Sequence, residues 1–377
     1  QEPTTVPVVG SVGLAFCLSA NPRPVAGITF WSVGAIGYPA ARALSMYEGC
    51  LIGCSIVPDS KLKAAPNVTK RIASFDAGYK MIDKLEMFMV LAREQHFGHA
   101  AEHCGVTQPT LSSALRQLED HLGVVLVKRG SRYQGLTPEG ERVLEWARHI
   151  VGSTRSMRDE MRAMRFGLTG QVQIAVIPTA LSMVHELTTP FREKHPDVSF
   201  AVLSRTSTEI QALLDNLQID AGITYIDNEP LGRVTSIPLY LERYHLVTSN
   251  LEDFANRDSI TWREAAQLPL CLLTPDMQNR RIIDQHLDAA GAKVSATLES
   301  DSMIALFTHV QTGNWASIMP EKMVESFGMR DRVKSMPIIE PDAIHTVGLI
   351  TAKREPATPV VSALLKEAKL LSELEPT

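Results

Sequence analysis

Apolar residues recur at steps of three and four immediately after Met81, at Ile82, Leu85, Phe88, Met89 and Ala92. This spacing predicts an amphipathic helix over residues 81–95 with one buried face. A short second helix is expected over residues 99–104, where two adjacent alanines permit close packing against a neighbouring helix. Gly105 then allows a tight turn into the next element.

The segment after this turn has the pattern of a third helix. Thr107 is placed to cap it, and Pro109 falls in the first turn, where its missing N–H has no intrahelical partner. The inward stripe consists of Leu111, Leu115, Leu118 and Leu122. The polar residues left on the outer face and first turn are Gln108, Thr110, Ser112, Ser113 and Arg116.

Two short helices joined at a glycine, the second with a polar outer face, predict a helix-turn-helix. Glutamine and serine can hydrogen-bond base edges, and arginine can bind guanine or phosphate. The following segment, "VVLVKRGSRYQGLT", predicts a wing hairpin whose cations, Lys128, Arg129 and Arg132, contact the DNA backbone. The formal net charge is −5, so this basic patch is local.

These motifs carry a family resemblance. The segment "AAEHCGVTQPTLSSALRQLEDHLGVVLVKRGSRYQGLTPEG" resembles the N-terminal module of LysR-type transcriptional regulators, densely and without gaps. The resemblance implies DNA contacts from Gln108, Pro109, Ser112 and Ser113, with Arg129 and Arg132 in the wing. The chain departs from the family pattern at two positions: many relatives carry arginine where it has Ser113, and an aromatic residue where it has Val127. The first departure affects the expected base preference and leaves the binding mode unchanged.

A long helix over residues 139–167 is expected to link the DNA-binding domain to the rest of the chain. Its apolar positions alternate steps of four and three, like the seam of a coiled coil: Val143, Ala147, Ile150, Thr154, Met157, Met161 and Met164. We favour pairing with a second copy, which would present two recognition helices to two half-sites. The alternative is an amphipathic helix packed on its own chain.

From Gln171 onward, strand and helix patterns alternate, which predicts an α/β domain with a parallel sheet. A second set of elements follows, and the last strand and helix are expected to return to the first lobe. The two crossings between lobes are placed near residues 240–243 and 337–342, with a hinged cleft between the lobes. The family resemblance likewise implies a two-lobed effector domain similar to periplasmic solute-binding proteins.

Hydroxyl and amide side chains follow several predicted strands, at the edge where α/β proteins bind ligands. Helix N-termini at this edge favour an anion, so we expect a small, anionic effector. The candidate effector-binding residues are Thr179, Ala180, Ser204, Thr206, Thr224, Gln278 and Asn279. The alternative role of the serines and threonines is helix capping.

The first 80 residues contain short apolar runs broken by proline and glycine, and we expect a poorly ordered extension upstream of a natural start at Met81. None of its apolar runs reaches the roughly 18 residues of a membrane span. The cysteines, Cys17, Cys50, Cys54, Cys104 and Cys271, are odd in number and scattered, which predicts a reducing cytoplasm rather than a disulfide framework.

Two other classes of protein would account for parts of the sequence. His99, Glu102 and His103 match H-x-x-E-H, a spacing found in some zinc peptidases, but no third ligand is placed by the sequence. A solute-binding protein without DNA function would explain the α/β part and leave the helix-turn-helix unexplained. The G-x-S-x-G, phosphate-loop and dinucleotide-binding motifs are absent, so we expect neither an enzyme nor a cofactor or metal.

The sequence therefore predicts a cytoplasmic, ligand-responsive DNA-binding regulator. Its expected parts are an extension over 1–80, a winged helix-turn-helix over 81–138, a linker helix over 139–167 and an effector domain over 168–377. Its expected partners are double-stranded DNA, a small effector and further copies of the chain, as a homodimer or homotetramer; RNA polymerase is a further candidate and a membrane is not. The runs "AREQHFGHAAEHCGVTQPTLS" and "ITYIDNEPLGRV" look similar to regulators encoded beside formate dehydrogenase operons, which makes a small carboxylate the first ligand to try.

Overall fold

The computed structural model describes residues 81–128, 130, 132–292, 295–326, 328 and 332–374. The prediction for residues 1–80 lies outside this range, as does Arg129 of the predicted wing. No helix in the described ranges is long and apolar enough to cross a membrane.

The N-terminal part of the described chain contains four helices. A helix over residues 81–94 comes first, followed by α2 Phe97–His103, α3 Gln108–Leu122 and α4 Pro138–Phe166. Leu85 and Phe88 of the first helix pack with Leu111 and Leu118 of α3 in one buried cluster. The turn before α3 has Gly105 in the left-handed region, with φ 64°.

Side-chain caps fix the starts of α3 and α4. Thr107 Oγ1 accepts a hydrogen bond from the backbone N–H of Thr110 at the start of α3. Thr137 Oγ1 accepts one from Gly140 N at 2.9 Å and donates one to Val125 O at 2.6 Å, which ties the start of α4 to the wing. In the described part of the wing, Val127 and Leu136 form an antiparallel bridge.

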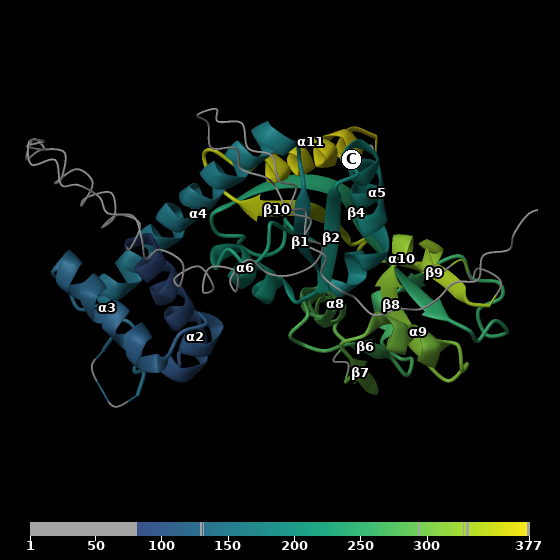
Figure 1. The fold of residues 1–377 in the computed structure, drawn as a ribbon. Coiled ribbons are helices and arrows are strands. Elements are labelled where there is room, and N and C mark those ends of the chain that lie inside the picture. Colours follow the sequence, from purple (N-terminus) through teal and green to yellow (C-terminus); the bar gives the residue numbers. More distant parts are fainter. Residues whose placement is uncertain are drawn as a thin grey trace, which may run out of the picture. The chain divides into compact units, whose positions relative to one another are not determined.

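The effector domain is organised around one mixed sheet with the strand order β2-β1-β3-β10-β4-β9-β5. Figure 1 labels β2, β1, β10, β4 and β9 among these strands. The strands of the first lobe are β1 Gly170–Val176, β2 Val198–Ser204, β3 Ala221–Tyr225, β10 Ile344–Ala352 and the first half of β4 Val234–Thr248. Its helices are a 3-10 helix Pro178–Met183, α5 Val184–Lys194, α6 Ser207–Asp215 and α11 Pro359–Leu374. β1, β2 and β3 are parallel, as predicted, whereas β10 runs antiparallel between β3 and β4 because the chain returns from the second lobe.

The second lobe uses the other half of β4. Its strands are β5 Ile260–Thr261, β6 Cys271–Leu273, β7 Leu298–Ser300, β8 Ala316–Pro320 and β9 Lys334–Ile339. Its helices are α7 Trp262–Ala265, α8 Gln278–Ala289, α9 Met303–Val310 and α10 Glu321–Ser326. β4 pairs with β10 up to Arg243 and with β8 and β9 beyond it, so this single strand belongs to both lobes.

The two predicted crossings between the lobes differ in secondary structure. Residues 240–243 lie inside β4, which continues through both lobes without interruption. Residues 337–342 contain the end of β9 and the turn that precedes β10. The hinge motion between the lobes at these two segments stays a prediction.

Candidate functional site

The outer face of α3 presents the residues predicted to contact DNA. Gln108, Pro109, Thr110, Ser113 and Arg116 are exposed, and Ser112 is half-buried. A shallow hollow on this face is lined by Pro109, Thr110, Ser113, Ala114 and Gln117. Gln117, which the sequence interpretation did not single out, donates a hydrogen bond from Nε2 to Ser113 Oγ at 3.3 Å. The sequence signal for Gln117 was its position one helical turn after Ser113, which places the two side chains on the same face of α3.

The wing supplies the charge near this face. Lys128 and Arg132 are exposed, and no salt bridge to either is found within the described ranges. These two cations are therefore available to phosphate oxygens.

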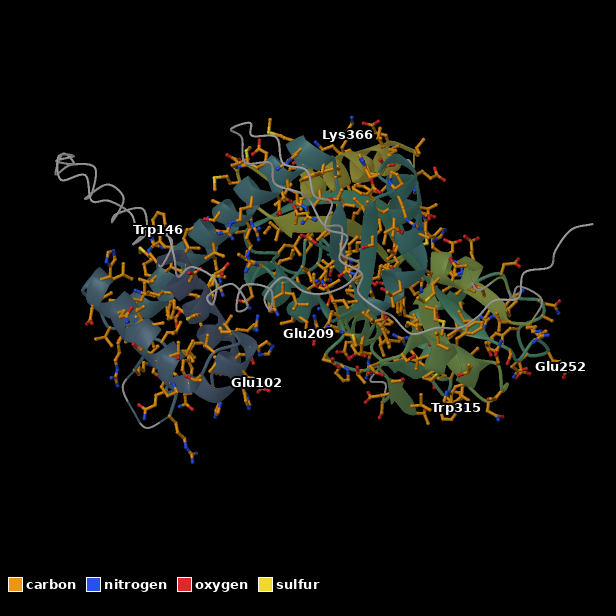
Figure 2. The ribbon with its side chains drawn as sticks, viewed as in Figure 1. Glu102, Trp146, Glu209, Glu252, Trp315 and Lys366 are labelled. Carbon is orange, nitrogen blue, oxygen red and sulfur yellow. The ribbon has the colours of Figure 1, made fainter. Side chains whose placement is uncertain are left out.

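The predicted dimerisation residues divide into two groups. Ala147 is fully buried and Val143 partly buried in the core that α4 shares with the first helix and α3. Met157, Met161 and Met164 are 57%, 55% and 77% exposed, and Ile150 is also open to solvent. Trp146, which Figure 2 labels on α4, is 58% exposed. The first two turns of the predicted seam thus pack on their own chain, while the later positions leave an apolar stripe uncovered.

Four predicted effector residues lie together at the ends of the strands. Thr179 is buried, with its hydroxyl 3.4 Å from the phenol oxygen of Tyr225. Asn279 Nδ2 donates to the same oxygen at 3.0 Å. Thr224 Oγ1 donates to Oε1 of Gln278 at 3.3 Å. The structure thus joins residues after β1 and on β3, from the first lobe, to the N-terminus of α8 in the second.

Three other predicted effector residues do not join this network. Thr206 forms a capping box at the start of α6: its Oγ1 accepts from the N–H of Glu209, whose carboxylate accepts from the N–H of Thr206. Ser204 is exposed at the end of β2, and Ala180 is buried without a polar side-chain atom. The capping alternative therefore accounts for Thr206.

A buried carboxyl that the sequence interpretation missed lies at the centre of the network. Glu242 of β4 is 1% exposed and accepts a hydrogen bond at Oε1 from the Tyr225 phenol. Burial raises the pKa of Glu242 to about 8, although the hydrogen bond from Tyr225 opposes the rise. The acid is thus largely protonated at neutral pH. The signal in the sequence was the alternation of "YLERYHL", which places Glu242 on the same strand face as Tyr240 and Tyr244.

Two orphaned atoms accompany this network. Oε2 of Glu242 and Nε2 of Gln278 are buried and have no hydrogen-bond partner in the described part of the chain. An unsatisfied buried polar atom costs about 1–3 kcal/mol, so such an atom is expected to meet water or a ligand.

A histidine pair adjoins the same network. His286 of α8 and His345 of β10 have their Nε2 atoms 3.5 Å apart, so one ring donates and the other accepts. Nδ1 of His345 lies 3.4 Å from Asp227 Oδ1, and Trp262 stacks on His286 with ring centroids 4.8 Å apart. Burial, with the neighbouring His345, lowers the pKa of His286. Within the described ranges, no group of three or more His, Cys, Asp or Glu side chains is placed to hold a metal.

The comparisons with known proteins agree with both halves of this architecture. Residues 82–141 match the family described as "Bacterial regulatory helix-turn-helix protein, lysR family", and residues 166–370 match "LysR substrate binding domain". The chain belongs to the LysR family. As a LysR-type regulator it is a DNA-binding transcription regulator with an effector-binding domain, and it is not an enzyme. Members of this family bind DNA and small-molecule effectors and form oligomers.

The named relatives are peroxide-response regulators. A "Hydrogen peroxide-inducible genes activator" of Haemophilus influenzae is 25% identical over 78% of this chain and 96% of its own length. A "Probable hydrogen peroxide-inducible genes activator" of Mycobacterium avium is 30% identical over 71% of this chain and 86% of its own length. The structure of a full-length OxyR variant from Pseudomonas aeruginosa shares the fold, with TM-score 0.61 and 24% identity over 77% of this chain and 94% of that one.

The described cysteines do not have the character of reactive thiols. Cys271 is fully buried in β6, and its Sγ lies 3.7 Å from Leu306 O and 3.5 Å from Ala316 O. Burial raises the pKa of the Cys271 thiol, and burial likewise raises that of Cys104 at the end of α2. Thiolate chemistry requires a lowered pKa and access, so neither cysteine is suited to react with peroxide.

Proposed function

We propose that this LysR-family protein is a ligand-responsive, sequence-specific regulator whose effector is a small anion bound at the ends of β1, β3 and α8. The observation that carries this proposal is the orphaned Nε2 of Gln278, a buried N–H donor at the N-terminus of α8. Thr179 and Asn279 add neighbouring hydroxyl and amide groups. Hydrogen-bond donors at a helix N-terminus favour a negatively charged oxygen.

The neutral form of Glu242 supports the same ligand class. At neutral pH its protonated carboxyl adds no negative charge to the network. The raised pKa therefore removes the repulsion that an ionised Glu242 would exert on an anionic effector.

The effector acts because its affinity for the closed arrangement of the two lobes differs from its affinity for the open arrangement. Tyr225 belongs to the first lobe and Asn279 to the second, so a ligand between these elements is sensitive to the distance between them. A ligand with equal affinity for both arrangements would change nothing. The response reaches DNA through the relative placement of paired recognition helices and the bend that they impose.

The proposed assembly is a homodimer through the exposed stripe of α4, extended to a homotetramer through effector-domain contacts. Such an assembly acts on DNA in the cytoplasm, with RNA polymerase as a further candidate partner. A link to formate metabolism has no support from the named relatives, so formate enters only as one small carboxylate among those to be tried.

The test is fluorescence anisotropy of the full chain on the DNA that flanks its own gene, across a salt series. We expect nanomolar affinity, much tighter than for scrambled DNA and falling steeply with salt. The same assay then screens formate and other small carboxylates. Equal affinity for scrambled DNA would contradict sequence-specific recognition, and footprints of unchanged length with a bound effector would contradict the mechanism of response.

A further inference from the structure

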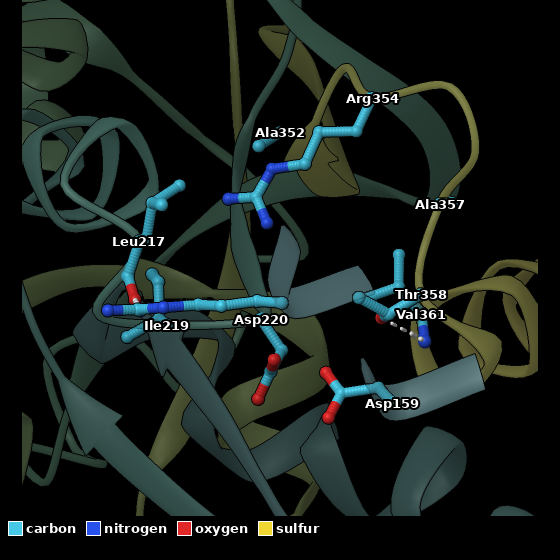
Figure 3. A pocket seen from close by; sticks show the side chains of 10 residues that line it. Asp159, Leu217, Ile219, Asp220, Ala352, Arg354, Ala357, Thr358 and Val361 are labelled. Atoms are coloured by element: carbon cyan, nitrogen blue, oxygen red, sulfur yellow. Dashed lines mark hydrogen bonds between the residues drawn. The ribbon is translucent and has the colours of Figure 1, made fainter. Parts of the chain in front are cut away.

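A cavity lies between the linker helix α4 and the effector domain, away from the Glu242 network. Its volume is about 90 Å³, which is room for roughly six water-sized spheres and therefore for a molecule of a few heavy atoms (Figure 3). The charged side chains that line it are Arg155, Asp159, Asp220 and Arg354. Two come from α4 and two from the effector domain.

Arg354, two residues after the end of β10, forms the basic side of this cavity. No carboxylate of the described residues lies within the 4.0 Å ion-pair distance of its guanidinium. Burial and the nearby Arg155 charge lower the pKa of Arg354, while Asp220 opposes the effect. An arginine nevertheless stays charged in proteins, so the cavity contains an incompletely compensated cation.

Gly152 of α4 lies beside the Arg354 side chain. A Cβ at Gly152 would lie 3.4 Å from Nε and 3.6 Å from Cδ of Arg354, which is ordinary van der Waals contact. The Arg354 side chain therefore packs directly against α4.

The second cation of the cavity, Arg155, is already engaged. Its guanidinium donates to Leu217 O and to Glu86 Oε1, both at 3.3 Å. Arg354 is therefore the arginine available to a ligand.

The acidic side consists of Asp159 and Asp220, whose carboxylates point toward one another (Figure 3). Oδ2 of Asp220 accepts a hydrogen bond from Gln173 N at 2.8 Å. Asp159 has neither a hydrogen bond nor an ion pair with any described residue. Burial raises the pKa of Asp220, and the negative charge of Asp159 raises it further. The Arg354 charge partly opposes this rise, but no ion pair within 4.0 Å joins Arg354, or another described cation, to either carboxylate.

We propose that this cavity binds a small zwitterion, an α-amino acid with a short side chain. The ligand carboxylate pairs with Arg354, and its ammonium group lies between Asp159 and Asp220. A simple anion would leave the facing carboxylates uncompensated, and a simple cation would leave Arg354 unpaired. At the N-terminus of α11, Pro359 has no N–H and Thr358 Oγ1 accepts a hydrogen bond from the N–H of Val361.

An occupied cavity would join α4 to the effector domain by charge-assisted hydrogen bonds at both ends. A bound amino acid would therefore change the free-energy difference between positions of α4 relative to the effector domain. Coupling between sites is reciprocal, so DNA and the amino acid would change each other's affinity by the same factor. Regulation by an amino acid in this cavity would be separate from regulation by the anion proposed to bind at the ends of β1, β3 and α8.

The test is isothermal titration calorimetry of the full chain, in amine-free buffer, with glycine, alanine and serine. Acetate and methylamine serve as probes that carry one charge each. The variants are Arg354→Gln and Asp159→Asn, the second of which changes an exposed helix residue and should fold normally. Arg158→Gln and Glu160→Gln are matched controls, because both residues are exposed neighbours on α4 outside the cavity.

We expect one site per chain, with affinity about tenfold weaker in each cavity variant and unchanged in each control. Acetate and methylamine should each bind at least about tenfold more weakly than alanine. A Thr179→Val variant, altered in the cleft, should keep the amino-acid affinity. Absence of binding heat with all three amino acids, equal affinity in the Asp159→Asn chain, or acetate binding as tightly as alanine would each overturn the proposal.

Discussion

The phenol of Tyr225 donates a hydrogen bond to the carboxyl of Glu242, and both side chains are buried where the two lobes of the effector domain meet. Tyr225 ends β3, in the first lobe, and Glu242 lies on β4, which runs through both lobes. Asn279 approaches the same phenol from α8 in the second lobe. This contact therefore joins the strand shared by the lobes to the proposed effector site.

The first prediction concerns pH. The pKa of Glu242 is about 8 in the folded chain, above its ordinary value of 4.5, so between these values the folded state retains a proton that the unfolded state has lost. Its contribution to stability is complete below pH 4.5 and is lost as the pH rises toward 8. We expect this group alone to lower the free energy of unfolding by about 2 kcal/mol between pH 6 and 8.

Urea denaturation of the wild-type chain and of Glu242→Gln, at several pH values in this interval, measures this effect. Glutamine keeps the size of the side chain and the acceptor for Tyr225 but cannot ionise. The variant should therefore show a shallower decline in stability with pH. Parallel pH profiles for the two chains would contradict the assignment.

The second prediction separates helix capping from effector binding. Thr206→Ala removes the capping box of α6 and should cost about 1 kcal/mol of stability without changing effector affinity. Thr179→Val removes a hydroxyl beside Tyr225 and should weaken the effector's influence on DNA binding. Thermal denaturation and effector titrations of both variants provide the comparison. If Thr206→Ala lost the effector response and kept its stability, the capping role assigned to Thr206 would be wrong and an effector-binding role would replace it.

Local sequence signals predicted the helices better than the buried site. The leucine stripe from Leu111 to Leu122 and the cap at Thr107 are short-range features, and α3 has the expected residues. β10 inserts antiparallel between β3 and β4, an arrangement that depends on pairing across more than a hundred residues of chain. Periodicity carries no information on such long-range pairing.

Long-range contacts also limited what could be predicted of the proposed effector site. Thr179, Thr224, Gln278 and Asn279 could be anticipated because each follows or ends a strand, where α/β proteins bind ligands. Glu242 could not, because its role depends on the phenol of a residue on another strand and on complete burial. Ala147 matched the coiled-coil spacing, yet it is buried in the helical core of its own chain, because one apolar stripe can serve two partners along its length.

The third prediction concerns the two kinds of DNA contact. Arg132→Ala should weaken binding to all sequences and reduce the slope of log affinity against log salt by about one. Ser113→Ala should instead weaken binding to the cognate site more than to scrambled DNA. Arg192→Ala, an exposed arginine on α5, controls for the loss of one positive charge. Equal losses on cognate and scrambled DNA for both variants would contradict the assigned roles.

The fourth prediction concerns the exposed stripe of α4. Replacing Met157 and Met161 by glutamate places charges in the proposed contact between copies and should shift the chain toward monomer. The control is Arg162→Glu on an exposed position of the same helix. Sedimentation velocity measures the association, and circular dichroism checks that the fold is retained. An unchanged dimer fraction in the double variant would place the interface elsewhere.

The fifth prediction follows from the cysteines. Relatives of this chain are named hydrogen peroxide-inducible gene activators, but the Cys271 thiol is buried and its raised pKa disfavours the thiolate that reacts with peroxide. We therefore expect micromolar hydrogen peroxide to leave the DNA affinity unchanged, and Cys271→Ser to behave as the wild type does. Anisotropy with and without peroxide, with mass spectrometry of the cysteines, tests this expectation. A peroxide response that Cys271→Ser abolishes would contradict it, because it would require the β6 thiol to become accessible in another conformation.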